Sequence, residues 1–555
     1  MKKMDLFVTS LFLFCCFGSK GIAEPMQSYI DAYVRLVKPL QMAANIAYWE
    51  AATTGKDENF DLFSQYDLQL KKITGDQKQF EILKTLLTQT ATDSLLKRQL
   101  QVIYNQFLPN QIDPLLQQRI VNQTSLVERK FSTFRGEMNG TLVNQNEIDA
   151  ILKTEKNSDI RQAAWEAGKQ VGEAVSMDIL HLVKLRNEAA QSLGFANFHT
   201  LSLTSAEQDP DQLDALMAEL QQLSEEPFLR IKAELDSILS FNYDIDRHNL
   251  MPWHYHDLFF QETPQIFAVD LDRYYENRDV VELARLFFQG IHLPVDQILL
   301  HSDLYERAGK NPHAFSTDID REGDVRILCN VVNNERWMET MLHELGHATY
   351  DQYQSPSTPW LLRGAAHSFT TEGVAMFFGR LSRHPVWMQE MLGLSNQERD
   401  EITAVADKYM QLKQIIFARW AMVMYYFEKE MYANPDQDLN ALWWGLIKKY
   451  QHVTPPPQRI KPDWATKIHI ALYPAYYHNY LLGELFASQL YEYYRDNVLK
   501  AASDEQVAWV EQIKLGDFMR KRVFTLGAKY PWQEMIKKAT GEYLSAAAFA
   551  RQFVK

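Results

Sequence analysis

Apolar side chains recur every three or four residues through most of the chain. In the segment that begins at Asp209, a good N-cap residue, Pro210 occupies the first helical position and leucines follow at helical spacing. The same spacing appears in residues 30–37, 80–100 and 402–432. Because such a stripe buries one face of a helix, the pattern predicts a mainly α-helical protein.

Strand-like alternation is confined mainly to residues 314–332. β-formers there flank the turn-prone segment 318–324, which predicts a small hairpin or sheet. Three consecutive prolines at 455–457 open an extended loop that runs to about residue 465. The sequence has no internal repeat, low-complexity tract or composition break, so residues 24–555 are expected to form one large domain.

The N-terminus has the three parts of a secretory signal. Lys2 and Lys3 precede an apolar run over residues 6–17, and small residues, among them Ala23, stand at the expected cleavage site. We therefore predict a signal peptide over residues 1–23 and an exported protein, periplasmic or secreted. The apolar run is too short to span a bilayer and no later run of about 18 apolar residues occurs, so no transmembrane anchor is expected.

Charge and cysteine content narrow the function. The 71 acidic and 57 basic side chains give a net charge of −14, and no Lys/Arg block could neutralise phosphates, which argues against nucleic acid as a partner. The acidic surface is interpreted as an ordinary solvated exterior. Of the three cysteines, Cys15 and Cys16 lie in the predicted signal, so Cys329 cannot form an internal disulfide. Its apolar surroundings favour a buried hydrophobe over a nucleophile.

The first chemical signal is the sequence His343-Glu344-Leu345-Gly346-His347. Good helix formers precede it, and residues four apart share one face of a helix, so both imidazoles can reach one cation with Glu344 beside them. A catalytic zinc ion needs three protein ligands and an open position for water. The motif therefore predicts two zinc ligands, His343 and His347, and a general base, Glu344.

Glu372 is the leading candidate for the third ligand. It lies in a largely apolar helical segment, residues 368–378, where an unpaired carboxylate is costly to bury. Metal ligation would explain its presence. Two histidines and one glutamate leave a net positive centre that lowers the pKa of water to about 7, so the set predicts metal-assisted hydrolysis.

Further motifs extend this pattern through the C-terminal half of the chain. They are Ala348-Thr349-Tyr350, Leu361-Leu362-Arg363-Gly364-Ala365, Trp443-Trp444, Lys449-Tyr450-Gln451, Pro455-Pro456, Lys467-Ile468-His469-Ile470, Pro531-Trp532 and Thr540-Gly541. With the zinc motif, they resemble the angiotensin-converting enzyme family of zinc dipeptidyl carboxypeptidases, most densely after Asn311. The resemblance implies a mainly α-helical, two-lobed body with a deep central channel and a small β-sheet near the zinc site. It also implies that the N-terminal helices, roughly residues 26–110, form a lid that admits short peptides.

The resemblance assigns roles to residues outside the zinc motif. It makes His469 and Tyr480 the donors to the oxyanion that forms during attack on the scissile carbonyl. His313 and Ala314, which precede the predicted hairpin, resemble the segment that holds the substrate backbone. Ala314 would pair through its main chain and His313 through its ring.

Recognition of a free C-terminus is also implied by the resemblance. Lys467 and Tyr477 resemble the pair that captures the substrate's C-terminal carboxylate, which is why such enzymes release dipeptides; a cation and a phenol suit a carboxylate. Tyr476 is the alternative to Tyr477, because the segment between His469 and Tyr480 contains one residue more than it does in the family. The glutamine that assists in the family has no clear match in residues 253–257, where Tyr255 is the candidate substitute.

The chain departs from the family at three more positions. Met376 stands where the family has an acidic residue that orients a zinc histidine, so another acceptor is expected to take that role. Asn479 replaces an arginine just before Tyr480, which argues against the family's chloride activation. Pro312 replaces a cysteine whose partner corresponds to Cys329, so that disulfide is lost.

We predict one zinc ion per chain and the release of C-terminal dipeptides from oligopeptides, the activity of a peptidyl-dipeptidase. Two alternatives stay open. An oligopeptide endopeptidase of the thimet type shares the zinc motif and the helical body but does not need a free C-terminus. A non-catalytic zinc- or peptide-binding homologue would keep the fold, but the intact set of site residues argues against it. The sequence predicts neither the physiological peptide nor the oligomeric state.

Overall fold

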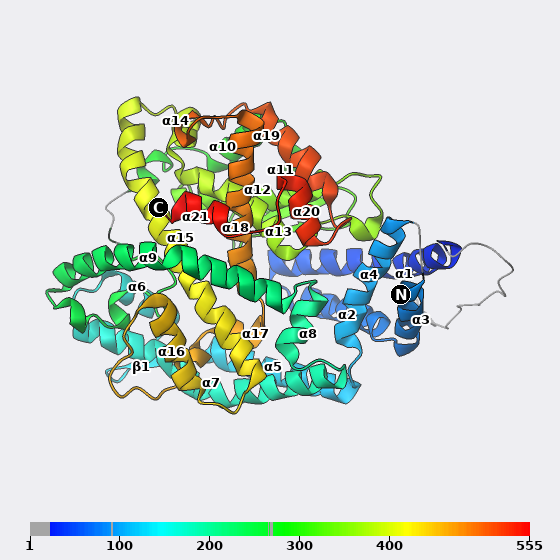
Figure 1. The fold of residues 1–555 in the computed structure, drawn as a ribbon, viewed down its shortest axis with the longest axis horizontal. Helices are drawn as coiled ribbons and strands as arrows, with labels where there is room; N and C mark the ends of the chain where they lie inside the picture. The colour runs from blue at the N-terminus through cyan, green and yellow to red at the C-terminus, as the bar shows by residue number, and fades with distance from the viewer. Residues whose placement is uncertain (1–22, 90–92, 265, 267–269, 555) are drawn as a thin grey trace.

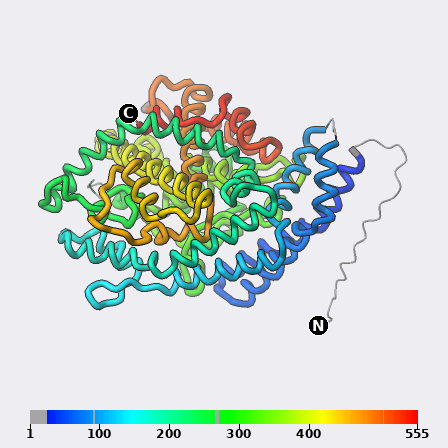
Figure 2. The backbone as a smooth tube through the Cα atoms, turned by 60° about the horizontal axis from the view of Figure 1, so that its bottom comes forward, coloured from blue at the N-terminus to red at the C-terminus, as the bar shows by residue number. Residues whose placement is uncertain are grey.

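The computed structural model describes residues 23–554, except 90–92, 265 and 267–269 (Figures 1 and 2). The predicted signal peptide therefore lies outside the described residues, apart from Ala23. The helices are α1 (Ala23–Thr54), α2 (Asp57–Thr74), α3 (Gln77–Thr88), α4 (Ser94–Phe107), α5 (Pro114–Thr133), α6 (Gln145–Thr154), α7 (Ser158–Ser192), α8 (Phe198–Ser205), α9 (Pro210–Tyr243), α10 (Val280–Gly290), α11 (Asp296–His301), α12 (Glu335–Gln352), α13 (Ser368–Gly379), α14 (Pro385–Leu392), α15 (Asn396–Ala433), α16 (Leu439–Gln451), α17 (Ile468–Leu472), α18 (His478–Tyr493), α19 (Ile513–Phe518), α20 (Trp532–Thr540) and α21 (Ala547–Phe553). The mainly α-helical prediction is confirmed.

The described strands form two antiparallel hairpins. β3 (Phe315–Asp318) pairs with β4 (Val325–Leu328), as the alternation in that stretch predicts. β1 (Gly136–Met138) pairs with β2 (Thr141–Val143), a hairpin that was not predicted from the sequence. Its turn is Asn139-Gly140, with both residues at positive φ, the strongest short-range hairpin signal.

Local signals set several helix boundaries as expected. The Asp209 side chain accepts the backbone N–H groups of Asp211 and Gln212, which caps α9 at Pro210. The zinc motif lies within α12, capped in the same way by Asn334. Residues 402–432 fall inside α15, whereas the periodic stretch 80–100 contains parts of two helices, α3 and α4.

The N-terminal helices have a hydrophobic cluster of their own. Buried residues from α1, α3 and α4 form it together with Ala190, Leu201 and Leu361 from the body of the protein. Further along α1, Trp49 packs against Leu328 of the β3–β4 hairpin. Figure 1 shows these helices, in blue, gathered on one side of the molecule.

Long helices connect the two halves of the remaining structure. α15 packs against α7, α8, α9 and α16 on one side and against α14, α18 and α21 on the other. Figure 1 shows α15 and α18 extending across the middle of the molecule, between the lower and the upper group of helices. The core around them is one continuous cluster, to which α15 contributes the buried rings of Trp420, Tyr425 and Tyr432. Among the described residues, no helix combines the length and the apolar character needed to cross a bilayer.

Two glycines let the three helices around the site approach closely. A Cβ at Gly346 of α12 would lie 2.8 Å from the Ala375 Cα of α13. A Cβ at Gly483 of α18 would lie 3.1 Å from the Cβ of Glu372 and from Met376 Sδ. Because both approaches leave no room for a larger side chain, α13 is held between α12 and α18, and this position brings Glu372 toward the histidines of α12.

Candidate metal centre and active site

Three candidate zinc ligands meet between α12 and α13. His343 and His347 lie one turn apart on α12, and Glu372 faces them from α13. The two Nε2 atoms are 3.2 Å apart, and Glu372 Oε2 lies 3.6 Å from Nε2 of His343 and 3.7 Å from Nε2 of His347. Among the described residues, these form the one group of three or more His, Cys, Asp or Glu placed to share an ion. Ligands at about 2.0–2.1 Å from a tetrahedral zinc ion lie about 3.3–3.4 Å apart, so the three atoms fit zinc.

Burial controls the protonation of these groups. It lowers the pKa values of His343 and His347, which keeps both imidazoles neutral, the form that binds metal. Burial raises the pKa of Glu372 to about 7, and nearby Glu484 adds to the effect. Burial and then Glu372 raise the pKa of Glu344 to about 8. Burial thus disfavours the ionised form of both carboxyl groups, and a bound dication would stabilise that ionised form.

A threonine takes the orienting role that the family gives to an acidic residue. Thr371 Oγ1 lies 2.7 Å from His347 Nδ1, so this hydroxyl fixes the ring while Nε2 points to the other candidate ligands. Met376 instead lines a cavity one turn beyond Glu372. Thr371, which directly precedes Glu372 in the sequence, therefore occupies the place expected for another partner of the zinc-ligating histidine.

Cys329 has the properties of a core residue. It is free and fully buried directly after β4. Burial raises the pKa of its thiol, and the nearby Glu344 carboxylate adds to this. A nucleophilic cysteine needs a lowered pKa, so these surroundings agree with the prediction of a buried hydrophobe.

A cavity of about 1190 Å³ contains the two candidate oxyanion donors, His469 and Tyr480, and also Met376. Burial, then the Lys467 charge, lowers the pKa of His469 to about 4, so the ring is neutral and its buried Nδ1 has no hydrogen-bond partner. Burial, followed by Tyr476, raises the pKa of Tyr480 to about 12, so its phenol keeps its proton. Both groups are therefore free to donate a hydrogen bond into the cavity.

Lys467, the candidate ligand of the substrate carboxylate, is bonded to Gln261 in the wall of the same cavity. Lys467 Nζ donates to Gln261 Oε1 at 2.6 Å, and Gln261 lines the same cavity. Sequence reasoning missed Gln261 because it searched residues 253–257. The suggested substitute, Tyr255, is wrong: its hydroxyl accepts from Lys232 at 2.8 Å and donates to Asp236 at 2.9 Å in the interior.

The structure separates the two candidate tyrosines. Tyr477 lines the cavity, and Lys467 Nζ lies 5.1 Å from the centre of its ring. Tyr476 packs instead against the ring of Tyr480 and lies toward Glu372 and Ser368. Of the two, Tyr477 is the tyrosine beside the lysine.

The predicted backbone-binding segment leads into β3. Ala314 is half-buried and immediately precedes Phe315, and His313 is exposed, with its backbone N–H bonded to Asn311 Oδ1. Among the described strands β3 pairs with β4 alone, and α1 contacts β3 at both of its ends, through Asn45 at Asp318 O and through Tyr48 at Phe315. No contact places His313 against the candidate zinc ligands.

Asn479 lies in a buried hydrogen-bond chain. Gln208 Nε2 donates to Asn479 Oδ1 at 2.7 Å, and Gln208 Oε1 lies 2.8 Å from Nε2 of His478. All three side chains are buried, and they brace the first turn of α18, on which Tyr480 stands. This neutral network occupies the position where the family has an arginine.

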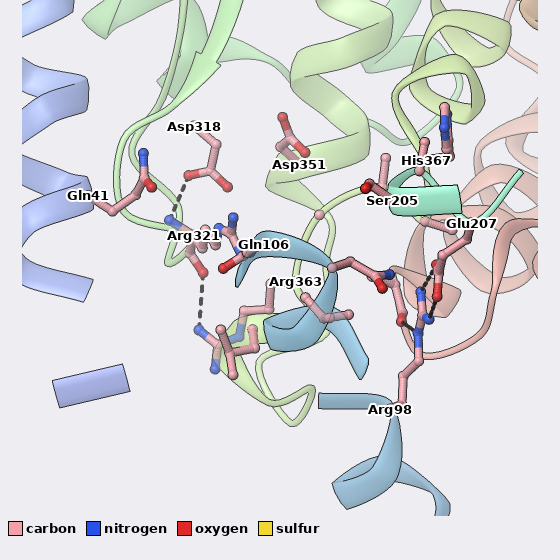
Figure 3. A pocket seen from close by; sticks show the side chains of 18 of the residues that line it. Gln41, Arg98, Gln106, Ser205, Glu207, Asp318, Arg321, Asp351, Arg363 and His367 are labelled. Atoms are coloured by element: carbon pink, nitrogen blue, oxygen red, sulfur yellow. Dashed lines mark hydrogen bonds and ion pairs between the residues drawn. The ribbon is translucent and has the colours of Figure 1, made fainter. Parts of the chain in front are cut away.

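A second cavity, of about 490 Å³, lies between the N-terminal helices and the body (Figure 3). Gln41 of α1 and Arg98 of α4 line it, together with Asp318 and Asp351 of the body. Asp351 is one turn beyond His347, so this cavity borders the candidate metal centre. Figure 3 shows the bidentate ion pair between Arg98 and Glu207, which ties α4 to the loop after α8.

Comparisons with known proteins agree with this site. A model described as peptidase family M3 matches residues 151–555, and one described as angiotensin-converting enzyme matches residues 22–256. An angiotensin-converting enzyme-like protein, Ace3, of Mus musculus is 24% identical over 455 residues, 73% of this chain and 59% of that protein. An angiotensin-converting enzyme of Mesocricetus auratus is 23% identical over 459 residues, 75% of this chain and 34% of that protein. A thermostable carboxypeptidase 1 of Pyrococcus furiosus is 23% identical over 268 residues, 44% and 52% of the two chains. The matches thus span between a third and three-fifths of these relatives.

Proposed function

The chain belongs to peptidase family M3, and from this premise we propose that it is a zinc-dependent peptidase that releases dipeptides from the free C-terminus of oligopeptides. The resemblance to the angiotensin-converting enzyme family is confirmed by the matching relatives. One observation carries the choice of a dipeptidase: Lys467, bonded to Gln261, and His469 line or border one cavity and are two residues apart in the chain. The ring centre of Tyr477 lies 5.1 Å from Lys467 Nζ and 5.1 Å from the centre of the His469 ring. Lys467 Nζ and the His469 ring are therefore within about 10 Å of each other, and an extended dipeptide of about 7 Å fits between them.

Each residue around the metal has a specific task in this reaction. Held by His343, His347 and Glu372, zinc would supply a positive charge that acidifies water and polarises the scissile carbonyl. Glu344 accepts a proton from the attacking water and returns it to the amine of the departing dipeptide. Thr371 keeps the His347 ring in the orientation that ligation needs.

Hydrogen-bond donors stabilise the charge that develops during attack. The neutral ring of His469 and the protonated phenol of Tyr480 donate to the oxyanion. Because both are half-buried in a cavity rather than in open water, their hydrogen bonds are stronger than they would be at the surface. The main chain at Ala314, just before β3, would pair with the peptide upstream, and no described strand other than β4 pairs with β3.

The free C-terminus is recognised by charge. Burial lowers the pKa of Lys467 to about 8, so the amine is protonated at neutral pH, and Gln261 holds it in place. The substrate carboxylate would accept from Lys467 and from the Tyr477 phenol. The groups that contact this buried ammonium are one amide and three aromatic rings, so it gains from a carboxylate partner, which ties binding to a free acid terminus.

The N-terminal helices are proposed to limit the size of the substrate. Their separate hydrophobic cluster and the 490 Å³ cavity beneath them support a lid that covers one end of the site. Arg98 and Glu207 join this layer to the body. Short peptides would enter and folded proteins would be excluded. The export expected from residues 1–23 stays a prediction.

An oligopeptide endopeptidase is the second candidate. The match to peptidase family M3 is compatible with it, because cleavage within a peptide needs the same zinc ligands and general base but not Lys467. The two candidates differ only in whether activity depends on a free C-terminal carboxylate.

Hydrolysis by this site is tested with purified enzyme and a mixture of short peptides. Glu344→Gln keeps the three ligands and is expected to lower kcat about 10²–10⁴-fold. Glu401→Gln, at an exposed position on α15, is the matched control and should leave kcat unchanged. Chelation should abolish wild-type turnover, and added zinc should restore it. Full activity of Glu344→Gln, or turnover that resists chelation, would reject the proposed mechanism.

A further inference from the structure

Gln414 is a buried amide without a partner in the wall of the large cavity. It lies on α15, its side chain is 2% exposed, and it lines the same 1190 Å³ cavity as His469, Tyr477 and Tyr480. Its Oε1 has no hydrogen-bond partner, and its Nε2 donates to none of the described residues. Neither end of the amide is therefore bonded within the described residues, and a group that enters the cavity can bond to it once the side chain rotates out of the wall.

Most other described glutamines with a buried, unpartnered Oε1 are anchored through Nε2, and Gln352, outside the lining of this cavity, is the exception. Gln111 donates to Thr74 O, Gln354 to Tyr350 O and Gln451 to Phe260 O. Gln414 has no such anchor. Because an amide that gives up its water without a partner costs free energy, its position is unfavourable in the free protein and favourable only when a ligand supplies the missing bonds.

The charges around Gln414 satisfy one another. Glu339 lies 3.1 Å from Lys413 Nζ and 3.0 Å from Arg383 Nη2, and Glu335 accepts from Arg383 Nε at 2.6 Å. Two acidic and two basic side chains therefore neutralise this part of the wall. The group left unsatisfied is a neutral donor and acceptor, which fits an uncharged hydrogen-bonding partner rather than an ion.

Gln414 lies between the two ends of the site along α15. Trp420, six residues later, packs its ring against Tyr477 and lies 5.5 Å from Lys467 Nζ, which is the carboxylate end. Six residues of helix span about 9 Å, and an extended dipeptide spans about 7 Å. Met376, on the helix that holds Glu372, lines the same cavity from the metal side. Lys413, next to Gln414, contacts Glu339 one turn before His343, so Gln414 lies on α15 between the residue that reaches toward the metal end and the residue that contacts Lys467.

We propose that Gln414 determines specificity by binding an uncharged amide or hydroxyl side chain on the residue that follows the scissile bond. The inference rests on the proposed peptidase function, and it adds a substrate class to it. The Gln414 amide donates through Nε2 and accepts through Oε1, so a glutamine or asparagine side chain can satisfy both of its ends. An apolar side chain of the same size would leave both unpaired.

The kinetic test compares Gln414→Met with wild type on free-acid peptides that differ only in the residue after the scissile bond, as Gln, Met or Glu. Wild type should prefer Gln, and Gln414→Met should lose about tenfold in kcat/KM on that peptide while changing less than about twofold on the other two. Gln411→Met, at a partly exposed position on α15 outside the cavity lining, is the matched control and should change none. Equal losses on all three peptides would assign the amide to the substrate main chain and overturn side-chain selection. Unchanged kcat/KM on all three would overturn any substrate contact.

A second measurement needs no turnover. Thermal shifts are recorded for zinc-loaded wild type and Gln414→Met with free dipeptides whose first residue is Gln or Met. The Gln dipeptide should raise the Tm of wild type more, and the difference should vanish in Gln414→Met. Without ligand, Gln414→Met should melt at or above the wild-type Tm, because it removes an unsatisfied buried amide. A lower Tm with unchanged dipeptide preference would show a purely structural role. Dipeptide selection without turnover would reject the proposed hydrolysis and keep the Gln414 site.

Discussion

Thr371 Oγ1 lies 2.7 Å from Nδ1 of His347, so the residue that precedes the candidate glutamate ligand orients one of the candidate histidine ligands. Thr371 and Glu372 are neighbours in the first turns of α13, so the position of Glu372 is tied to the orientation of the His347 ring. The arrangement explains how the site can dispense with an acidic residue at Met376.

Removal of this hydroxyl should weaken metal binding. Thr371→Val keeps the shape of the side chain but leaves His347 Nδ1 without a partner, and we expect about 10–100-fold weaker zinc affinity. Competition with a chromogenic chelator measures it. Thr371→Ser retains the hydroxyl and should bind zinc as wild type does. Wild-type affinity in Thr371→Val would show that the contact does not support the metal centre.

Recognition through Lys467 should depend on pH. Its pKa is lowered to about 8 by burial, against the opposing charges of Asp257 and Glu262, so the ammonium is present below that pH and lost above it. KM for free-acid peptides should therefore rise as pH increases from about 7 to about 9. The pH profile of KM measures this. Lys467→Met should raise KM at neutral pH and remove the rise. A KM that is flat with pH in wild type would contradict carboxylate binding by Lys467.

The phenol of Tyr480 should act on the rate and not on binding. Tyr480→Phe removes one oxyanion donor, and we expect kcat to fall about 10²–10³-fold with little change in KM. Tyr476→Phe removes a phenol whose ring touches Tyr480 but which lies outside the cavity lining, so it is the control. Steady-state kinetics at saturating zinc separates the two. Equal effects of both substitutions would reduce Tyr480 to a packing role.

Metal removal should destabilise the protein more at neutral than at acidic pH. The folded-state pKa values of Glu344 and Glu372 are raised from 4.5 to about 8 and about 7. The zinc-free folded state therefore holds protons that the unfolded state has released, and its free energy of unfolding falls as pH rises through this range. A bound dication offsets this loss, so the rise in Tm on adding zinc should be larger at about pH 7.5 than at about pH 5.5. Calorimetry with zinc or chelator measures it; an equal rise at both pH values would contradict the electrostatic account.

Local features were predictable from the sequence because short-range physics determines them. Asp209 caps α9, and the spacing of His343 and His347 puts both rings on one face of α12. Glu372 was identifiable because a carboxylate in an apolar helix needs a partner. The Asn139-Gly140 hairpin has an equally local signal, although it was not among the predictions.

Contacts between residues far apart in the sequence could not be predicted from local patterns. Gln261 is 206 residues from Lys467 and follows an irregular loop whose backbone N–H groups are held by the buried Asp257 carboxylate. No periodicity marks such a loop, so the glutamine was sought in the wrong segment. Gln414 directly precedes the apolar run 415–418 of α15 and follows Lys413, so nothing in the sequence marks it, and only the fold shows that its amide is unpaired.

The central claim is that this zinc site releases dipeptides from a free C-terminus. The most direct measurement is mass spectrometry of the products from matched oligopeptides with free and amidated C-termini, for wild type, Glu344→Gln and chelated enzyme. The account predicts sequential loss of C-terminal dipeptides from the free acids, little cleavage of the amides and none without Glu344 or metal. Internal cleavage that is indifferent to amidation would contradict it and make the protein an oligopeptide endopeptidase.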